Sequence, residues 1–137
     1  ANPGSPLEPL NKVASGGEQS RVKLALKAAL GKHITLSCQV FDEIDTGISG
    51  ATAEKVGNLM SELAKNQQII TITHLPQVAS KGNTHWLISK SSTDTTTESS
   101  VTILSDESRL DELARMLSGA KITQAAKNQA EALLKAR

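Results

Sequence analysis

The residues best suited to chemistry in this sequence are two adjacent carboxylates, Asp42 and Glu43, which follow a short strand-like run at residues 38–41. Hydrophobic strands seldom end on clustered acids unless a cation lies beyond them, because neighbouring like charges repel. Asp45 adds a third carboxylate to the loop that follows. An acidic surface turn is the commoner reading of an isolated Asp-Glu pair, but this loop indicates a site for a metal ion and a nucleotide.

A second candidate group is Ser15-Gly16-Gly17-Glu18, which precedes a helical pattern expected to end near Gly31. Ser15 and Glu18 have the spacing of a capping box, which satisfies two free N–H groups at a helix start. Each glycine costs a helix roughly 1 kcal/mol relative to alanine. Two glycines in the first turn therefore suggest that bare N–H groups approach a ligand, and a helix N-terminus favours phosphate. We expect both glycines to face outward, toward a second molecule.

A third candidate is His74, which directly follows the β-branched run at residues 68–73. A helical stripe at residues 51–65, with Ser49 as its N-cap, separates this run from the central strand expected at residues 34–41. Strand, crossover helix and strand predict a parallel pair whose carboxyl ends share one edge, where ligands bind in α/β sheets. His74 should therefore lie beside the acidic pair. We also expect both faces of the central strand to be buried.

The rest of the chain predicts a hairpin and two helices. Apolar residues alternate near residues 86–88 and 101–103, and the polar stretch at residues 91–100 between them is expected to be a flexible loop. Ser105 and Thr123 are predicted to cap the two last helices.

Length and composition favour one domain over residues 1–137 with a sizeable core, since 38% of the residues are hydrophobic. The 15 basic and 14 acidic residues give a net charge of +1, which by itself predicts neither a nucleic-acid nor a membrane partner. The single cysteine excludes a disulfide framework and favours a reduced, cytoplasmic setting. Three prolines predict an extended lead-in at residues 1–12, and its abrupt start suggests a piece of something longer.

Taken together, these motifs resemble, in order, the signature loop, the Walker B strand, the D-loop and the switch histidine of an ABC-type ATPase. The residues that carry this resemblance are Ser15-Gly16-Gly17-Glu18, Asp42-Glu43, Asp45-Thr46-Gly47 and His74. The implied fold is α/β: the C-terminal half of an ABC-type P-loop NTPase head, with a parallel sheet, flanking helices, a terminal hairpin and terminal helices.

Over most of residues 2–90, the amino-acid sequence more closely resembles the bacterial RecN family, which are SMC-like ATPases of DNA double-strand break repair. The matching segments are Asn2-Pro3-Gly4, Lys12-Val13-Ala14-Ser15-Gly16-Gly17-Glu18, Phe41-Asp42-Glu43-Ile44-Asp45-Thr46-Gly47-Ile48-Ser49-Gly50 and Thr73-His74-Leu75-Pro76-Gln77-Val78-Ala79.

This resemblance implies ATP and Mg²⁺ as cofactors and a role for each strand-end residue. Asp42 would hold Mg²⁺, Glu43 would polarise the attacking water, and His74 would sense the γ-phosphate. Asp45 would act across a dimer interface. Such catalysis of phosphoryl transfer relies mainly on positioning and electrostatics.

The signature residues Ser15, Gly16, Gly17 and Glu18 would serve ATP bound to a second head, so that hydrolysis needs two heads closed on each other. The implied partners are an N-terminal half-head, a second head in a homodimer, and DNA contacted through the full-length protein, with no membrane partner.

A Walker A loop, G-x-x-x-x-G-K-[ST], is absent from the sequence. We therefore expect the chain alone to be inactive, and to act in the cytoplasm, at the nucleoid, as part of a complete head. Two alternatives stay open: a non-catalytic module for nucleotide-dependent dimerisation, and the ATPase domain of another ABC protein such as a transporter.

Overall fold

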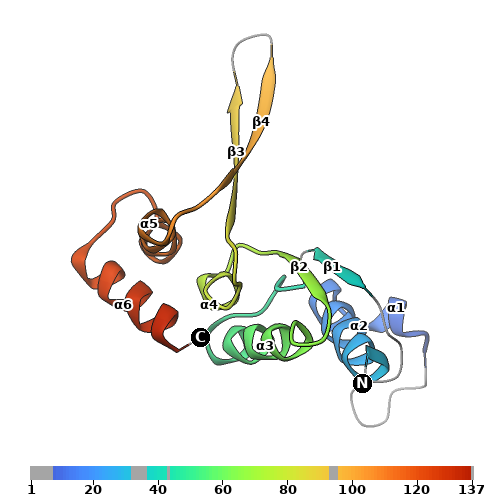
Figure 1. The fold of residues 1–137 in the computed structure, drawn as a ribbon. Coiled ribbons are helices and arrows are strands. Elements are labelled where there is room, and N and C mark those ends of the chain that lie inside the picture. The colour runs from blue at the N-terminus through green and yellow to red at the C-terminus, as the bar shows by residue number, and fades with distance from the viewer. Residues whose placement is uncertain (1–7, 32–36, 43, 93–95, 137) are drawn as a thin grey trace. The chain divides into compact units, whose positions relative to one another are not determined.

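The computed structural model describes residues 8–31, 37–42, 44–92 and 96–136. The chain falls into two compact units, Ala1–Val78 and Ala79–Arg137, and each is described by itself. Helices and strands alternate through the first unit, and the second contains a hairpin and two helices (Figure 1). The predicted α/β class is confirmed, whereas the single domain over residues 1–137 stays a prediction.

Two helices and a strand open the first unit: α1 (Leu10–Val13), α2 (Gly16–Gly31) and β1 (Cys38–Asp42). The expected extended lead-in is wrong for its last residues, because α1 begins at Leu10. All the prolines of this region lie before Leu10, so nothing opposes a helical turn there, and the Lys12 N–H donates to the Pro9 carbonyl at 2.9 Å. Residues 1–7 lie outside the described residues.

The first unit continues with α3 (Gly50–Leu63), β2 (Gln68–Ile72) and α4 (Pro76–Ala79). Strands β1 and β2 are parallel, in a register that pairs Cys38 with Gln68 and Asp42 with Ile72. The predicted parallel pair and its connecting helix are confirmed. Of the expected central strand, residues 34–36 lie outside the described part of the chain.

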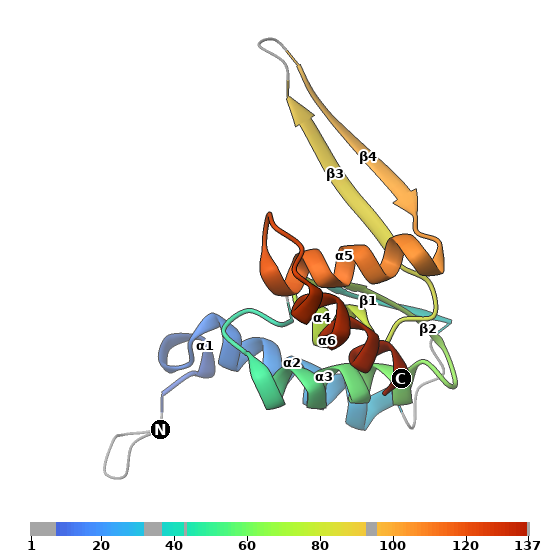
Figure 2. The same cartoon turned by 90° about the vertical axis from the view of Figure 1, so that its left-hand side faces the viewer.

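Strand β1 is buried on one face only. Gln39 and Phe41 are buried, whereas Cys38, Val40 and Asp42 are exposed. Helices α2 and α3 lie on the same side of the β1–β2 pair in both views (Figures 1 and 2). The expectation that both faces are buried is wrong, because in the described part of this unit only one face of the pair has helices against it.

The core of the first unit links α2, β1, the following loop, α3 and α4. Leu24 of α2 lies against this core, and the Lys27 ammonium lies 4.7 Å from the centre of the Phe41 ring. Burial of these side chains holds the β1–α3 loop in place. The buried members are Leu24, Phe41, Ile44, Ile48, Ala53, Val56, Met60 and Val78.

The second unit begins with an antiparallel hairpin, β3 (Trp86–Ser92) and β4 (Thr97–Ile103). Cross-strand pairing of Ser91 with Glu98 and of Ser92 with Thr97 shows that most of the loop expected at residues 91–100 is strand. Serine and threonine tolerate this because their hydroxyls pair across the strands, as the Ser92 and Thr97 hydroxyls do at 3.1 Å. Residues 93–95 lie outside the described part.

Helices α5 (Asp106–Ser118) and α6 (Gln124–Lys135) complete the second unit. The predicted N-caps are confirmed, since Ser105 accepts from the Ser108 N–H and Thr123 from the Ala126 N–H. The two helices pack through a small core of Leu113, Ala114, Ala126 and Ala130. Among the residues that the structure describes, no helix combines the length and the apolar character needed to cross a membrane.

Candidate functional site

The start of α2 is fixed by a reciprocal cap. The Ser15 N–H and the Ser15 hydroxyl both donate to Glu18 Oε2 at 2.8 Å, and the Glu18 N–H donates to Ser15 Oγ at 3.4 Å. The predicted capping box is confirmed. Donation from the Ser15 backbone, and then from its hydroxyl, lowers the pKa of the Glu18 carboxyl below its ordinary value of 4.5. Glu18 is therefore an exposed carboxylate held at the helix start.

The two glycines of this turn have different surroundings. Gly16 is exposed, and a methyl group added to it would meet nothing within 4 Å. Gly17 is buried, and a methyl group there would overlap the Thr46 carbonyl oxygen of the same chain. The expectation that both glycines face outward is therefore wrong for Gly17. Its lack of a side chain is explained by close packing of α2 on the loop after β1.

The carboxyl ends of β1 and β2 lie at one edge of the parallel pair. Asp42, the last residue of β1, is in register with Ile72, the last residue of β2. His74 follows two residues later, with 71% of its side chain exposed. The predicted convergence is therefore found for Asp42 and His74. Glu43 lies outside the described residues.

Asp45 is the buried centre of this edge, with a relative exposure of 1%. Its Oδ2 accepts a short hydrogen bond from the Thr73 hydroxyl and a second from the His74 backbone N–H at 3.2 Å. The same oxygen lies 3.6 Å from Nδ1 of the His74 ring, which is an ion-pair distance rather than a hydrogen bond. For the other oxygen, Oδ1, no hydrogen-bond partner is found among the described residues. Asp45 thus joins the ends of both strands.

The loop that carries Asp45 is shaped by its glycines. Gly47 and Gly50 have positive φ angles of 73° and 53°, a backbone conformation that favours glycine. Ile44 and Ile48, on either side of the turn, are buried in the core. The turn therefore presents Asp45 inward while its ends stay anchored. Ser49 stands at the N-cap position of α3, as predicted, but its side chain makes no capping hydrogen bond.

The donor set at this edge fits Mg²⁺ only as a partial site. Within the described residues, no three His, Cys, Asp or Glu side chains come together as a metal cluster. Asp42 is exposed at a strand end. Mg²⁺ bound together with a nucleotide usually takes only one or two protein carboxylates, the other ligands being waters and phosphates. Asp42 fits that pattern as a single ligand.

Thr73 is a site residue to which the sequence pattern gave no role. Its hydroxyl donates to Asp45 and accepts from the Leu75 N–H at 3.0 Å. It therefore fixes the backbone on both sides of His74. A hydroxyl residue directly after a strand and directly before a candidate histidine is the signal that could have identified it.

Comparison with known proteins finds relatives over nearly the whole chain. The chain is 49% identical over 134 residues to the DNA repair protein RecN of Xylella fastidiosa strain Temecula1, and 41% identical over 134 residues to that of Bacillus subtilis. These alignments cover 97% and 98% of the chain but 24% and 23% of the relatives. The chain thus spans about a quarter of the length of the relatives it matches. No protein-family model matches it.

Among solved structures, the similar chains are heads of SMC ATPases. One comes from a study of ATP-driven dimerization and DNA-stimulated activation of SMC ATPases, with a TM-score of 0.59 and 26% identity over 86% of this chain and 70% of that one. Another is the Smc head domain with a coiled coil and joint from Pyrococcus yayanosii, with a TM-score of 0.63 and 26% identity over 80% of this chain and 20% of that one.

Proposed function

We propose that this chain, a homologue of one segment of the RecN DNA repair proteins with the fold of part of an SMC-like, ABC-type ATPase head, is the C-terminal half of such a head. In the complete protein it would finish an ATP hydrolysis site used in recombinational repair of DNA double-strand breaks. The chain alone has no Walker A loop, and we expect no measurable ATP turnover from it.

The observation that carries this proposal is the shared edge of β1 and β2, where Asp42 and the exposed His74 ring lie at neighbouring strand ends. Asp42 would be a Mg²⁺ ligand, Glu43 would polarise the attacking water, and His74 would contact the γ-phosphate. A bound Mg²⁺ would neutralise charge on the phosphates. The chain's own contribution is to hold these groups on a rigid edge and so to reduce reorganisation during the reaction.

The start of α2 would act on a second head. Ser15, Gly16 and Glu18 are exposed at this helix start, where the helix dipole suits a phosphate. The Ser15 and Glu18 N–H groups are engaged in the capping box, so the backbone of the glycine turn would supply the contact. The buried Gly17 would contribute its backbone and its close packing rather than an open surface. The trans contact of Asp45, expected from the resemblance, stays a prediction that its burial does not favour.

The implied partners follow from this arrangement. They are the Walker A half of the same head, a second head in a homodimer, and DNA bound by the full-length protein, in the cytoplasm and at the nucleoid. The similar SMC structure, studied for ATP-driven dimerization, supports head pairing as the coarser part of this proposal.

The proposal is tested by co-expressing this chain with a Walker A half-head of a RecN-type protein and measuring ATP turnover. We expect turnover in the mixture, and its loss in Glu43→Gln, since the attacking water is then no longer polarised. Glu62→Gln is the matched control, because Glu62 is an exposed carboxylate on α3 whose ion pair in the described part of the chain is with Lys65. Equal rates for Glu43→Gln and the wild type would refute the role given to Glu43.

The exposed capping box also favours a second candidate, a module that pairs heads without hydrolysis. That module would show ATP-dependent dimerisation that survives Glu43→Gln but is lost in Ser15→Arg, and no turnover in any mixture. Size measurement of the mixture with and without ATP distinguishes the two candidates.

A further inference from the structure

We propose that Asp45 is a positioning residue that orients the switch histidine, His74, from within the same chain. This inference rests on the proposed function for its catalytic consequence, but the contacts that it invokes exist in this chain alone. The sequence resemblance implied that Asp45 acts on a second head. We infer instead that Asp45 acts on the site of its own head.

The backbone around His74 is held by one buried carboxylate. Oδ2 of Asp45 accepts from the Thr73 hydroxyl and from the His74 N–H, and Thr73 Oγ1 in turn accepts from the Leu75 N–H. A carboxylate acceptor makes such bonds stronger than a neutral one would. Three successive residues after β2 are thereby fixed to the loop after β1.

Among the described residues, the polar group found beside the His74 ring is the Asp45 carboxylate. Its side chain is 71% exposed, and Nδ1 lies 3.6 Å from Asp45 Oδ2. Two ring nitrogens are available in histidine, and a carboxylate on the Nδ1 side leaves Nε2 on the outer side of the ring. Through this contact Asp45 would favour the presentation of Nε2 to a ligand at this edge.

The position of Asp45 opposes a role in a partner molecule. Its relative exposure is 1%, against 71% for the side chain of His74 that it contacts. The Thr46 carbonyl next to it packs on Gly17. Moving the carboxylate outward would break both hydrogen bonds of Oδ2 and disturb the packing of α2.

The first test is amide hydrogen exchange of this chain. We expect the His74 amide to exchange about tenfold faster or more in Asp45→Ala, the change expected from losing a hydrogen bond to a charged acceptor. Asp45→Asn keeps the shape and a weaker acceptor, so it should give a smaller increase and guards against misfolding of the alanine variant. Glu62→Ala is the control and should leave His74 unchanged. Unchanged His74 exchange in both Asp45 variants would overturn the inference.

The second test uses heads reconstituted with a Walker A half. We expect Asp45→Asn to lower kcat while leaving KM for ATP close to that of the wild type, because the substitution misorients His74 without removing a nucleotide contact. In the main experiment, heads carrying Asp45→Ala are mixed with heads carrying His74→Ala. If Asp45 acts within its own chain, every site in a mixed pair lacks one of the two residues and activity stays low.

Recovery of turnover on mixing would overturn the inference, because a carboxylate acting in trans would restore one complete site in each mixed pair. A wild-type mixture without turnover would count against the proposed function instead. In that case the exchange measurement still decides the role of Asp45.

Discussion

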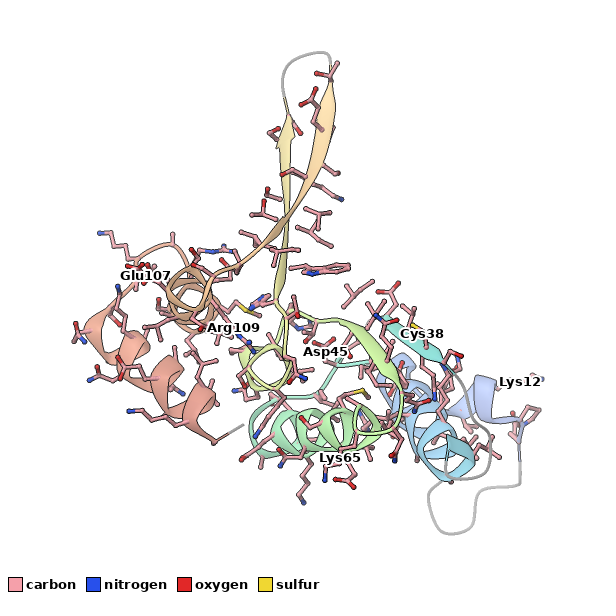
Figure 3. The ribbon with its side chains drawn as sticks, in the orientation of Figure 1. Lys12, Cys38, Asp45, Lys65, Glu107 and Arg109 are labelled. Carbon is pink, nitrogen blue, oxygen red and sulfur yellow. The ribbon has the colours of Figure 1, made fainter. Side chains whose placement is uncertain are left out.

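Asp45 in the first unit and Arg109 in the second are both charged and both almost fully buried, at 1% and 3% exposure. Their partners differ. Asp45 bonds a hydroxyl and one backbone N–H and lies beside an exposed imidazole. Arg109, on α5, donates to the carbonyl oxygens of Ala79 and Ser80, and also to those of Gly82 and Asn83 in the turn that follows α4 (Figure 3).

This difference in partners indicates a structural role for Arg109 and a functional role for Asp45. The guanidinium of Arg109 serves carbonyls at a helix end, groups that otherwise have no intrahelical partner. These hydrogen bonds to backbone carbonyls stabilise the turn that follows α4. Asp45 instead contacts a side chain that is open to ligands and has one oxygen, Oδ1, without a described partner. A buried charge next to an exposed titratable group is therefore the better functional candidate.

The largest effect should come from Arg109→Met, which keeps much of the side-chain length but removes the guanidinium. We expect the free energy of unfolding to fall by about 3 kcal/mol, because the carbonyl of the buried Ser80 and the partly buried carbonyls beside it lose a charged donor. Arg115→Met is the matched control, since Arg115 on the same helix is 54% exposed and pairs with Glu112, an interaction worth at most about 1 kcal/mol. Urea denaturation measures both, and similar losses would contradict a special role for Arg109.

A smaller effect is expected from Gly17→Ala, which tests how tightly the loop of Asp45 is held. The added methyl would overlap the Thr46 carbonyl, and such overpacking typically costs about 1–3 kcal/mol. Gly16→Ala is the control in the same turn, where the methyl meets nothing and alanine suits a helix better. Thermal unfolding should show a lower Tm for Gly17→Ala alone. If the two variants have the same Tm, the loop after β1 can shift to accommodate the methyl group, and Asp45 is held less rigidly than we infer.

The smallest effect should be a pH dependence in the surroundings of Arg109. Burial lowers the pKa of His85 below its ordinary value of 6.5, the positive Arg109 lowers it further, and Glu112 partly opposes this. A folded-state pKa below the unfolded one means that the unfolded chain binds more protons, so stability is full above about 6.5 and falls as pH drops below it. His85→Gln should reduce this dependence. Unfolding curves between neutral and mildly acid pH would refute the assignment if the variant and the wild type lose stability equally.

Much of the fold was readable from local pattern. At the helix starts, the side chains of Ser15, Ser105 and Thr123 each accept from the free N–H three residues on, a relation set by sequence spacing alone. The parallel pair followed from two strand-like runs separated by one amphipathic helix. The length of the hairpin could not be predicted from the sequence, because runs of serine and threonine are typical of loops, yet here they pair across the two strands.

The candidate site was predictable as a set of positions, but not in its internal contacts. That Asp42 and His74 share an edge follows from parallel pairing. The packing of Gly17 against Thr46 could not be predicted from the sequence. A glycine indicates only that there is no room for a side chain, and either a ligand or another part of the chain can occupy that space. Thr73 and Arg109 were missed for a related reason: Asp45 lies 28 residues from Thr73, and the carbonyls that Arg109 contacts lie 26–30 residues from it.

The sequence by itself determined which residues of this chain carry chemistry and which strand ends bring them to one edge, because residue type and period are local properties. Only the tertiary structure decided which carboxylate faces solvent and which is enclosed. Asp42 and Asp45 are three residues apart and chemically identical, yet one ends a strand in the open while the other is turned inward by the glycine-containing loop. Burial depends on packing between segments that are distant in the sequence, and this packing places the Asp45 carboxylate against His74.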